Sequence, residues 1–477
     1  MLALAAAPVS LWPFAVLVIC VVTLVVFITV FRIHAFLALL CAAMLAGILT
    51  TKLPGETSGP KAKGHWVQAM EMTVEGFGKT AGKIGVVIAL AAIIGACLAE
   101  SGAADKVVRR FLAFFGERRA GHAIITSGYV LSIPLFFETF VMLLMPLARA
   151  LHLRTRKDYM LYVLAICCGG TMTHSLVAPH PGPLAMAENL HLDIGLTIVV
   201  GIFGGMVPAA VIWCYAQWIA RRVNAPMRDL PGISVKELEA VVAKDERELP
   251  SFLASILPVI LPILLIGSVS VLTVLGGRTA FPWLFPPLEF LGDRHVALML
   301  GVIISVRLVM KQKGLSIEQT GELVAPPFAL AGVIILITSA GGAFGYMLKN
   351  SGVGESIAAL AEGRNVNLIF LGWLVSAVLR VAQGSATVAM ITASAIMSAI
   401  IGDGSSLPYH PVYLFLGIGF GSKMLSWMND AGFWTVAKLS GFTEIETLKS
   451  WSMIVTIASV TGLLLTLTVS ALFPFKQ

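Results

Sequence analysis

Charged residues are scarce in this chain of 477 residues. Asp, Glu, Lys and Arg make up 12% of it, whereas a soluble globular protein carries about 25%. Hydrophobic residues account for 57%, and long apolar runs recur along the chain, for example at 11–31, 195–220 and 252–275. Each run is long enough for a helix to cross a bilayer. The composition excludes an ordinary soluble protein and predicts an all-α polytopic membrane protein.

Sequence motifs for several kinds of chemistry are also missing. The chain has no glycine-rich phosphate loop that ends in Lys-Ser or Lys-Thr and no His-Glu-x-x-His motif. Its six cysteines all lie in apolar segments without metal-ligand spacing. The nearest nucleophile and base, Ser175 and His174, are neighbours on a predicted helix and do not face each other. We therefore expect no enzyme and no metal or organic cofactor.

The formal charge of +7 comes without a basic run in a polar region that could bind nucleic acid. The excess of Lys and Arg is better explained by cytoplasmic loops, which are enriched in these residues. The first apolar run, 11–31, lacks a basic start and an obvious cleavage site, so it does not resemble a signal peptide. The predicted surroundings are the lipid bilayer, and no nucleic-acid partner is expected.

The apolar runs divide into single spans and interrupted ones. The candidate spans are 11–31, 35–50, 81–99, 157–178, 195–220, 252–275, 294–310, 323–348, 411–428 and 449–473. Two further stretches, 121–150 and 366–401, are too long for one crossing and are broken near the middle, at 132–139 and 380–387. Each half has about 14–18 residues, whereas a crossing helix needs about 20. This pattern predicts two re-entrant hairpins.

The stretch 171–183 predicts a broken helix. Three prolines and a glycine fall within 179–183. A helix cannot continue through them, because each proline removes a donor and restricts its neighbour. Inside a bilayer such a break is tolerated only where protein or a water-filled cavity satisfies the freed backbone groups.

A hydrophilic segment, 221–250, divides the chain into two similar halves. The pattern Gly-x-x-Leu-x-x-Ser-Gly occurs at 95–102 and again 250 residues later, and the same shift places the break at 179–183 opposite 429–433. Most Lys and Arg fall on one face if both hairpins return to their side of entry. Each half then has about five crossings, an odd number, so the halves are predicted to be inverted.

The predicted organisation follows from this shift. The first inverted repeat covers 1–220, the cytoplasmic linker 221–250 and the second repeat 251–477. The hairpins lie at about 121–150 and 366–401, and the broken helices at about 157–190 and 411–440. Inverted repeats with broken helices are typical of secondary transporters whose binding site lies near the middle of the membrane.

Two carboxyl groups at the breaks are candidates for proton coupling. Glu138 lies in an apolar stretch, and a carboxyl removed from water has a raised proton affinity. The alternative is a carboxyl that stabilises the hairpin and never titrates. Asp430 follows Asn429 at the second break. Its alternative role is the N-cap of the resuming helix, a frequent use of Asp.

Other polar residues at the breaks are candidates for substrate binding. His180 or Arg380 could bind a carboxylate, although His180 could be structural and Arg380 could form a salt bridge with Glu138 or Asp430. Neutral groups that suit a polyhydroxylated ligand, or that cap helix ends, are Thr171, Thr173, Gln383, Ser385, Thr387 and Asn429. Lys423 could also bind the substrate carboxylate, but it is expected near the cytoplasmic end of its helix. His174 is expected to pack or bond the backbone.

Four motifs carry a family resemblance: IPLFFET at 133–139, APHPGP at 178–183, RVAQGSATVA at 380–389 and NDAGFW at 429–434. With these motifs, nearly the whole chain resembles the gluconate permease family of sugar-acid/proton symporters, part of the ion transporter superfamily. The residues at the matching motif positions are Glu138, His180, Gln383, Ser385, Thr387, Asn429 and Asp430. Ala431 stands where Ser is common in the family. The missing hydroxyl puts the exact substrate in doubt, because a site built for a given hydroxyl pattern discriminates strongly.

The resemblance implies proton-driven uptake of gluconate, glycerate or a related hydroxy-carboxylate across a bacterial inner membrane. It also implies a homodimer in which hairpins and broken helices move as a unit, in elevator fashion, against a scaffold. The scaffold would comprise about 11–110 and 252–365, and the moving unit about 121–220 and 366–473. A sodium-coupled carboxylate carrier is the close alternative, and a channel or a non-transporting membrane sensor is a more distant one.

Overall fold

A computed structural model describes residues 12–54, 63–116, 119–155, 159–223, 225–228, 248–274, 276–352, 367–402, 404 and 407–475. These residues form helices and connecting segments and contain no strand, which confirms the predicted all-α class. Of the predicted linker, residues 224 and 229–247 lie outside the described residues.

The described helices occur in two series. The first is α1 (Trp12–Thr29), α2 (Ala35–Leu49), α3 (His65–Glu100), α4 (Ala103–Phe115), α5 (Ala120–Leu131), α6 (Phe137–Thr155), α7 (Tyr159–Leu176), α8 (Pro181–Asn189) and α9 (Ile194–Ala220). The second is α11 (Phe252–Val274), α12 (Gly277–Ala280), α13 (Phe285–Leu291), α14 (Arg294–Lys313), α15 (Ile317–Asn350), α17 (Leu368–Gln383), α18 (Ala386–Ile401), α19 (Val412–Gly421), α20 (Ala431–Ser440), α21 (Glu444–Thr447), the π-helical turn η3 (Leu448–Ser452) and α22 (Met453–Leu472).

Within the described residues, seven helical segments are long and apolar enough to cross a membrane. They include α9, α11, α14 and the continuous stretch Glu444–Leu472, and five shorter apolar helices accompany them. The chain is therefore a polytopic membrane protein. Most predicted spans agree with the helix bounds to within a few residues.

Two kinds of predicted bounds were wrong. Helices α3 and α15 have 36 and 34 residues, longer than the predicted 81–99 and 323–348. Hydropathy misses the polar start of α3, where Glu75 and Lys79 form an ion pair one turn apart at 2.6 Å. The predicted span 411–428 instead ends at Gly421. The backbone then leaves the helical path, with Leu425 at a φ of +40°.

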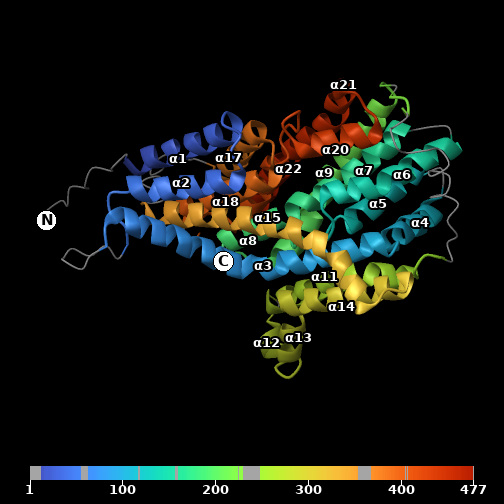
Figure 1. Cartoon of the computed structure of the whole chain (residues 1–477), viewed down its shortest axis with the longest axis horizontal. Helices are drawn as coiled ribbons and strands as arrows, with labels where there is room; N and C mark the ends of the chain where they lie inside the picture. Colours follow the sequence, from blue (N-terminus) through green and yellow to red (C-terminus); the bar gives the residue numbers. More distant parts are fainter. Residues whose placement is uncertain are drawn as a thin grey trace.

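Helices α3 and α15 lie side by side along the long axis of the molecule (Figure 1). Helix α15 also packs against α2 and α18, while α14 packs against α3 and α11. Helices α5, α6, α7 and α9 gather towards the other end of the long axis, and α12 and α13 project from the body (Figure 1). The α3–α15 pair thus forms a central support against which α2, α14 and α18 pack.

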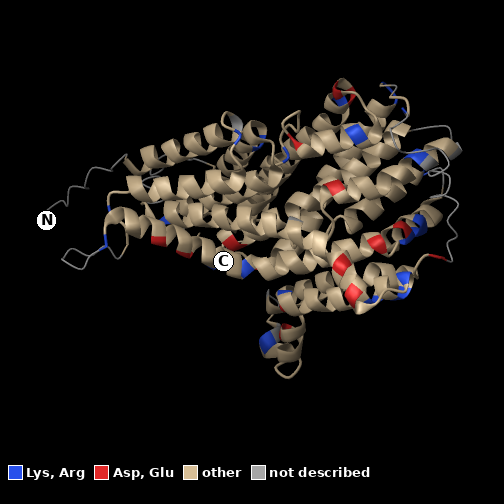
Figure 2. Ribbon diagram, in the orientation of Figure 1, with Lys and Arg blue, Asp and Glu red and all other residues tan. Residues whose placement is uncertain are grey.

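Charged residues are sparse in the body, and several lie along α4 and towards the end of α14 (Figure 2). The start of α4 and the end of α14 are close in space, because Lys313 at the end of α14 bonds Glu100, the last residue of α3. The sequence placed the basic residues of α4 and α14 on one face. The assignment of this face to the cytoplasmic side stays a prediction.

The helix bounds follow the register of the predicted repeat. Displaced by 250 residues, α3 would cover 315–350, next to the observed Ile317–Asn350 of α15. The same displacement carries α9 onto 444–470, within the observed stretch Glu444–Leu472. Helices α5 and α6, like α17 and α18, are separated by short breaks where the hairpins were predicted. The re-entrant path and the inverted orientation of the halves stay predictions.

Two of the breaks, between α5 and α6 and between α7 and α8, lie inside the protein. Residues Ser132 to Leu135, between α5 and α6, are buried. Val177, Ala178 and His180, between α7 and α8, are buried as well. The neighbouring core joins residues of α8, α18 and α19. The interrupted backbone is therefore shielded from lipid, as an intramembrane break requires.

The close packing of α15 on α18 generates a stability prediction. A Cβ added at Gly345 would lie 2.7 Å from the Cβ and 3.1 Å from the Cα of Ala395. No rotamer relieves this contact, so Gly345→Ala is expected to cost about 1–3 kcal/mol through overpacking. The measurement is the thermal unfolding temperature of the purified protein in detergent.

Gly332→Ala is the matched control, because it lies on the same helix with nothing within 4 Å of an added Cβ. It should leave the unfolding temperature unchanged or raise it slightly, since alanine favours a helix by up to about 1 kcal/mol over glycine. Equal unfolding temperatures for the two variants would contradict the described packing.

Candidate functional site

A cavity of about 500 Å³ lies where the helix breaks meet. This volume is typical of small-molecule sites, which span about 300–1,000 Å³. Apolar walls come from Phe136, Phe137, Pro181 and Trp451, and the Phe137 and Trp451 rings stack with centroids 4.8 Å apart. The polar lining residues are Glu138, Thr139, Thr171, His174, Ser175, Arg380, Gln383, Ser385, Thr387, Ser422, Lys423, Asn429 and Asp430.

Four helices begin at the cavity wall: α6, α8, α18 and α20. Their first-turn residues Glu138, Pro181, Ala386 and Ala431 all line it. The first N–H groups of a helix have no partner within the helix, and the helix dipole adds a partial positive charge there. The wall therefore presents several positive helix ends, which favour an anion.

The opposing negative helix ends are covered by side chains. At the end of α17, the Val381 carbonyl accepts from the Trp427 indole at 3.0 Å and from the Asn429 amide at 2.9 Å. The Asn429 amide also reaches the Ala382 carbonyl at 3.3 Å. Within α7, the Thr171 carbonyl accepts from Lys423. Because these carbonyls are bonded, their negative potential at the cavity wall is reduced.

Arg380 and Asp430 form a buried ion pair across the cavity wall. The Arg380 Nη2 and the Asp430 Oδ2 are 2.5 Å apart, and both side chains are at least 90% buried. Asp430 also caps α20, since its Oδ1 accepts from the Gly432 N–H at 3.0 Å, and Ser426 donates to its Oδ2. Both structural alternatives considered for these residues are present. The pair joins the α17–α18 break to the start of α20.

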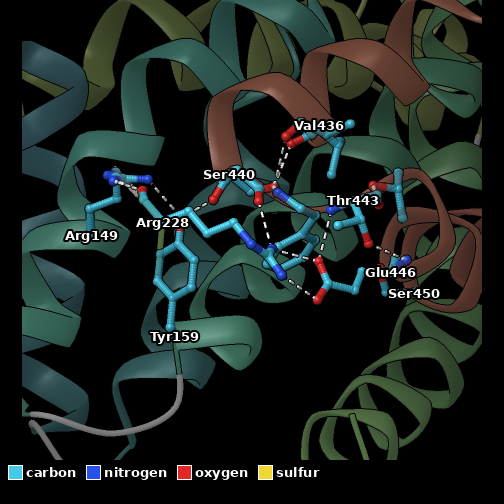
Figure 3. A network of polar contacts seen from close by, with 12 residues as sticks. Arg149, Tyr159, Arg228, Val436, Ser440, Thr443, Glu446 and Ser450 are labelled. Atoms are coloured by element: carbon cyan, nitrogen blue, oxygen red, sulfur yellow. Dashed lines mark hydrogen bonds and ion pairs between the residues drawn. The ribbon is translucent and has the colours of Figure 1, made fainter. Parts of the chain in front are cut away.

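The other end of α20 is also held, by the network in Figure 3. The Tyr159 hydroxyl donates to the Ser440 carbonyl at 2.6 Å. Arg228 donates to the Gly441 carbonyl at 2.8 Å and forms two bonds of 2.7 and 2.9 Å with Glu446. Arg149 in turn bonds the Arg228 carbonyl and the Tyr159 hydroxyl. These contacts fix the helix whose first residues form part of the cavity.

Glu138 lies in the first turn of α6 and is exposed to the cavity. Its charged neighbours are Asp430 and Arg380. Asp430 is committed to an ion pair, so Glu138 is the cavity-lining carboxyl that is open to exchange a proton with water. Its position agrees with a role in proton coupling, which stays a prediction.

The two histidines differ in their position relative to the cavity: His174 lines it and His180 does not. His180 is buried, and its Nε2 donates to the carbonyls of Ser132 at 2.9 Å and Leu135 at 3.0 Å. Thr173 bonds the Ser132 hydroxyl. Both residues therefore fasten the α7–α8 break to the α5–α6 break and are not part of the cavity lining. His174 packs as expected, with its ring centroid 4.5 Å from that of His180, and it also lines the cavity.

The remaining predicted binding residues come together at the cavity: Thr171, Gln383, Ser385, Thr387 and Asn429. Ser385 caps α18 by accepting from the Val388 N–H at 3.3 Å. Among the described residues, the buried Gln383 Nε2 has no hydrogen-bond partner. The Asn429 amide nitrogen is used by α17, which leaves its carbonyl oxygen as an acceptor. These groups can bind ligand hydroxyls as donors and acceptors.

Lys423 lies near the end of its helix, as expected, but that end is at the cavity. It follows α19 on the cavity wall and is only 3% exposed. The assignment of this helix end to the cytoplasmic side stays a prediction. Hydropathy predicted that this helix continues to residue 428. That prediction placed Lys423 inside the helix and not beside a break. The repeat would have corrected this, because a shift of 250 residues places Lys423 opposite Thr173, beside the first break.

Comparisons with known proteins identify relatives along nearly the whole chain. Residues 12–472 match the model of the GntP family permease. A gluconate permease of Pseudomonas aeruginosa is 32% identical over 456 residues, covering 94% of this chain and 96% of the relative. A low-affinity gluconate transporter of Escherichia coli K12 is 31% identical, covering 90% and 92%. The Gnt-II system L-idonate transporter of the same strain is 29% identical, covering 92% and 95%.

Two solved structures share the fold. MtrF of Neisseria gonorrhoeae, described as representing a class of antimetabolite efflux pumps, has a TM-score of 0.60 at 15% identity and covers 92% of this chain and 96% of its own. The YdaH transporter of Alcanivorax borkumensis has a TM-score of 0.57 at 15% identity, covering 93% and 98%. At this identity the likeness concerns the fold alone.

The buried ion pair at the cavity generates a stability prediction. Asp430→Asn leaves the Arg380 charge buried without its partner, which is expected to cost about 3–5 kcal/mol. Glu289→Gln is the matched control, because the Arg278–Glu289 pair has the same 2.5 Å separation but is largely exposed. That substitution should cost about 0–1 kcal/mol. Thermal unfolding of both variants compares them, and similar losses would argue against a special role for the buried pair.

Proposed function

Because this chain belongs to the GntP permease family, a family of membrane transporters, we propose that it takes up a sugar acid together with protons. The cargo would be gluconate, glycerate or a related hydroxy-carboxylate. The observation that carries this proposal is the cavity, whose wall combines positive helix starts with hydroxyl and amide side chains. The multi-pass chain resides in a bacterial inner membrane.

The two parts of the cavity wall suit the two parts of a sugar acid. The helix starts and basic side chains favour the carboxylate. Ser385, Thr387 and the Asn429 carbonyl offer partners for the hydroxyl groups. Gln383 supplies an amide nitrogen that has no partner among the described residues. Ala431 offers no hydroxyl at the start of α20, which leaves this position open to a bulkier or less polar part of the ligand.

Proton coupling is assigned to Glu138, with Asp430 as the second candidate. Glu138 is exposed to the cavity, so it can exchange protons with water there. Asp430 has an arginine partner at 2.5 Å and a capping role, both of which hold its carboxylate in place. A mobile proton at Glu138 therefore disturbs the structure less than one at Asp430.

Transport would follow elevator-like alternating access. The breaks and their helices, α5 to α9 and α17 to α22, would move against α1 to α3 and α11 to α15, with a homodimer formed through the latter set. One ion-pair cluster crosses this boundary: Glu188 of α8 binds Lys83 of α3 at 3.3 Å and Arg294 of α14. These bonds would break when α8 slides past the scaffold, so Glu188 would favour the conformation described.

Uptake into vesicles tests the proposed transport. In proteoliposomes with a more acidic exterior, labelled gluconate or glycerate should accumulate above its external concentration, because proton entry drives the cargo inward. Accumulation that needs a sodium gradient and ignores the pH gradient would establish the sodium-coupled alternative. Passage without accumulation would establish a channel, and a lack of any sugar-acid passage would contradict the proposed substrate.

Glu138→Gln separates proton coupling from substrate binding. The variant should lose accumulation driven by a pH gradient while retaining exchange of labelled for unlabelled substrate, since exchange needs no net proton movement. Asp430→Asn, measured in parallel, should reduce both through its effect on the structure. Equal loss of accumulation and exchange in Glu138→Gln would make Glu138 structural.

A further inference from the structure

We propose that Lys423, rather than Arg380, binds the carboxylate of the transported anion, and that the site accepts a monocarboxylate together with one proton. This inference rests on the proposed uptake of a sugar acid. It concerns which of the two basic side chains on the cavity wall is available to the ligand, and what charge the ligand can carry.

Arg380 is already engaged on both terminal nitrogens. Its Nη2 is 2.5 Å from the Asp430 carboxylate, and its Nη1 donates to the Gly384 carbonyl. A paired bond from an arginine to a carboxylate uses two of its nitrogens. Arg380 has N–H donors left, among them the buried Nε, but its charge is already balanced by Asp430, which also caps α20. Arg380 is occupied as a structural cation.

Lys423 has N–H donors that are available to a ligand, and it lacks an acidic partner among the described residues. Its ammonium group has three N–H donors, and it donates to the Thr171 carbonyl. No carboxylate of the described residues forms an ion pair with it. The side chain is only 3% exposed, and a buried charge without a counterion is unfavourable. An anion in the cavity would supply that counterion.

The formal charges on the cavity wall limit the negative charge that the transported ligand can carry. Two side chains are basic and two are acidic: Arg380, Lys423, Glu138 and Asp430. With Glu138 ionised these charges cancel, and with Glu138 protonated one positive charge remains, which balances one carboxylate. The other titratable groups beside this site are His174 on the wall and His180 behind it, and neutral imidazoles leave the balance unchanged. One proton would thus enter with each monocarboxylate, and a second carboxylate would find no counterion.

Ligand binding to purified protein tests the assignment with three compounds: gluconate, the neutral gluconamide and the dianion glucarate. Wild-type protein should bind gluconate, with glucarate and gluconamide both much weaker. Lys423→Met should weaken gluconate binding by at least about tenfold, the loss expected for one charge-assisted bond, and should reduce the preference for gluconate over gluconamide. Lys423→Arg should recover part of both.

Two control variants sharpen the comparison. Lys311→Gln removes an exposed lysine at the end of α14, away from the cavity lining, and should bind like the wild type. The double variant Arg380→Gln/Asp430→Asn removes the structural pair without changing the net charge, and should keep the preference for gluconate over gluconamide. If the double variant loses this preference while Lys423→Met keeps it, Arg380 holds the carboxylate and the proposal is overturned.

A measurement on the wild type remains decisive even if Lys423→Met fails to fold. Uptake of gluconate with one proton moves no net charge, so its rate under a fixed pH gradient should be independent of a membrane potential set with potassium and valinomycin. A rate that follows the potential, or tight glucarate binding, would overturn the charge balance. Failure of the wild type to bind or transport any sugar acid would instead overturn the proposed function itself.

Discussion

The structure depends on one constraint: a helix interrupted inside a bilayer must find partners for its free backbone groups. Here the partners are side chains from other breaks. His180 bonds the carbonyls between α5 and α6, Asn429 bonds the last carbonyls of α17, and Lys423 bonds a carbonyl of α7. Side chains from one break therefore bond the backbone at or beside another, which ties the breaks together.

The same constraint produces a binding site for an anion. The side chains satisfy mainly carbonyl groups, so the negative helix ends are covered while the starts of α6, α8, α18 and α20 remain at the cavity wall. Negative charge is limited as well, because Asp430 is matched by Arg380. Specificity for an acid thus arises from how the backbone is completed, and the hydroxyl and amide side chains add selectivity for a sugar.

Much of this arrangement could be predicted from the sequence, because apolar runs, prolines and an internal repeat record it directly. The break at 179–183 coincides with the start of α8, and the polar stretch at 380–387 coincides with the end of α17. What could not be predicted depends on three-dimensional contacts. Hydropathy extends α19 past Gly421, because the segment that follows stays largely apolar. Likewise, nothing local distinguishes His180, which bonds a backbone, from His174, which faces the cavity.

The central claim is that the cavity between the breaks holds a sugar-acid anion. An experimental structure of the protein with gluconate tests it most directly. The account predicts ligand density within the cavity, with the carboxylate at the Lys423 ammonium group, the hydroxyls towards Ser385, Thr387 and Asn429, and the Arg380–Asp430 pair intact. Ligand density outside this cavity, with the cavity itself holding only water, would contradict it.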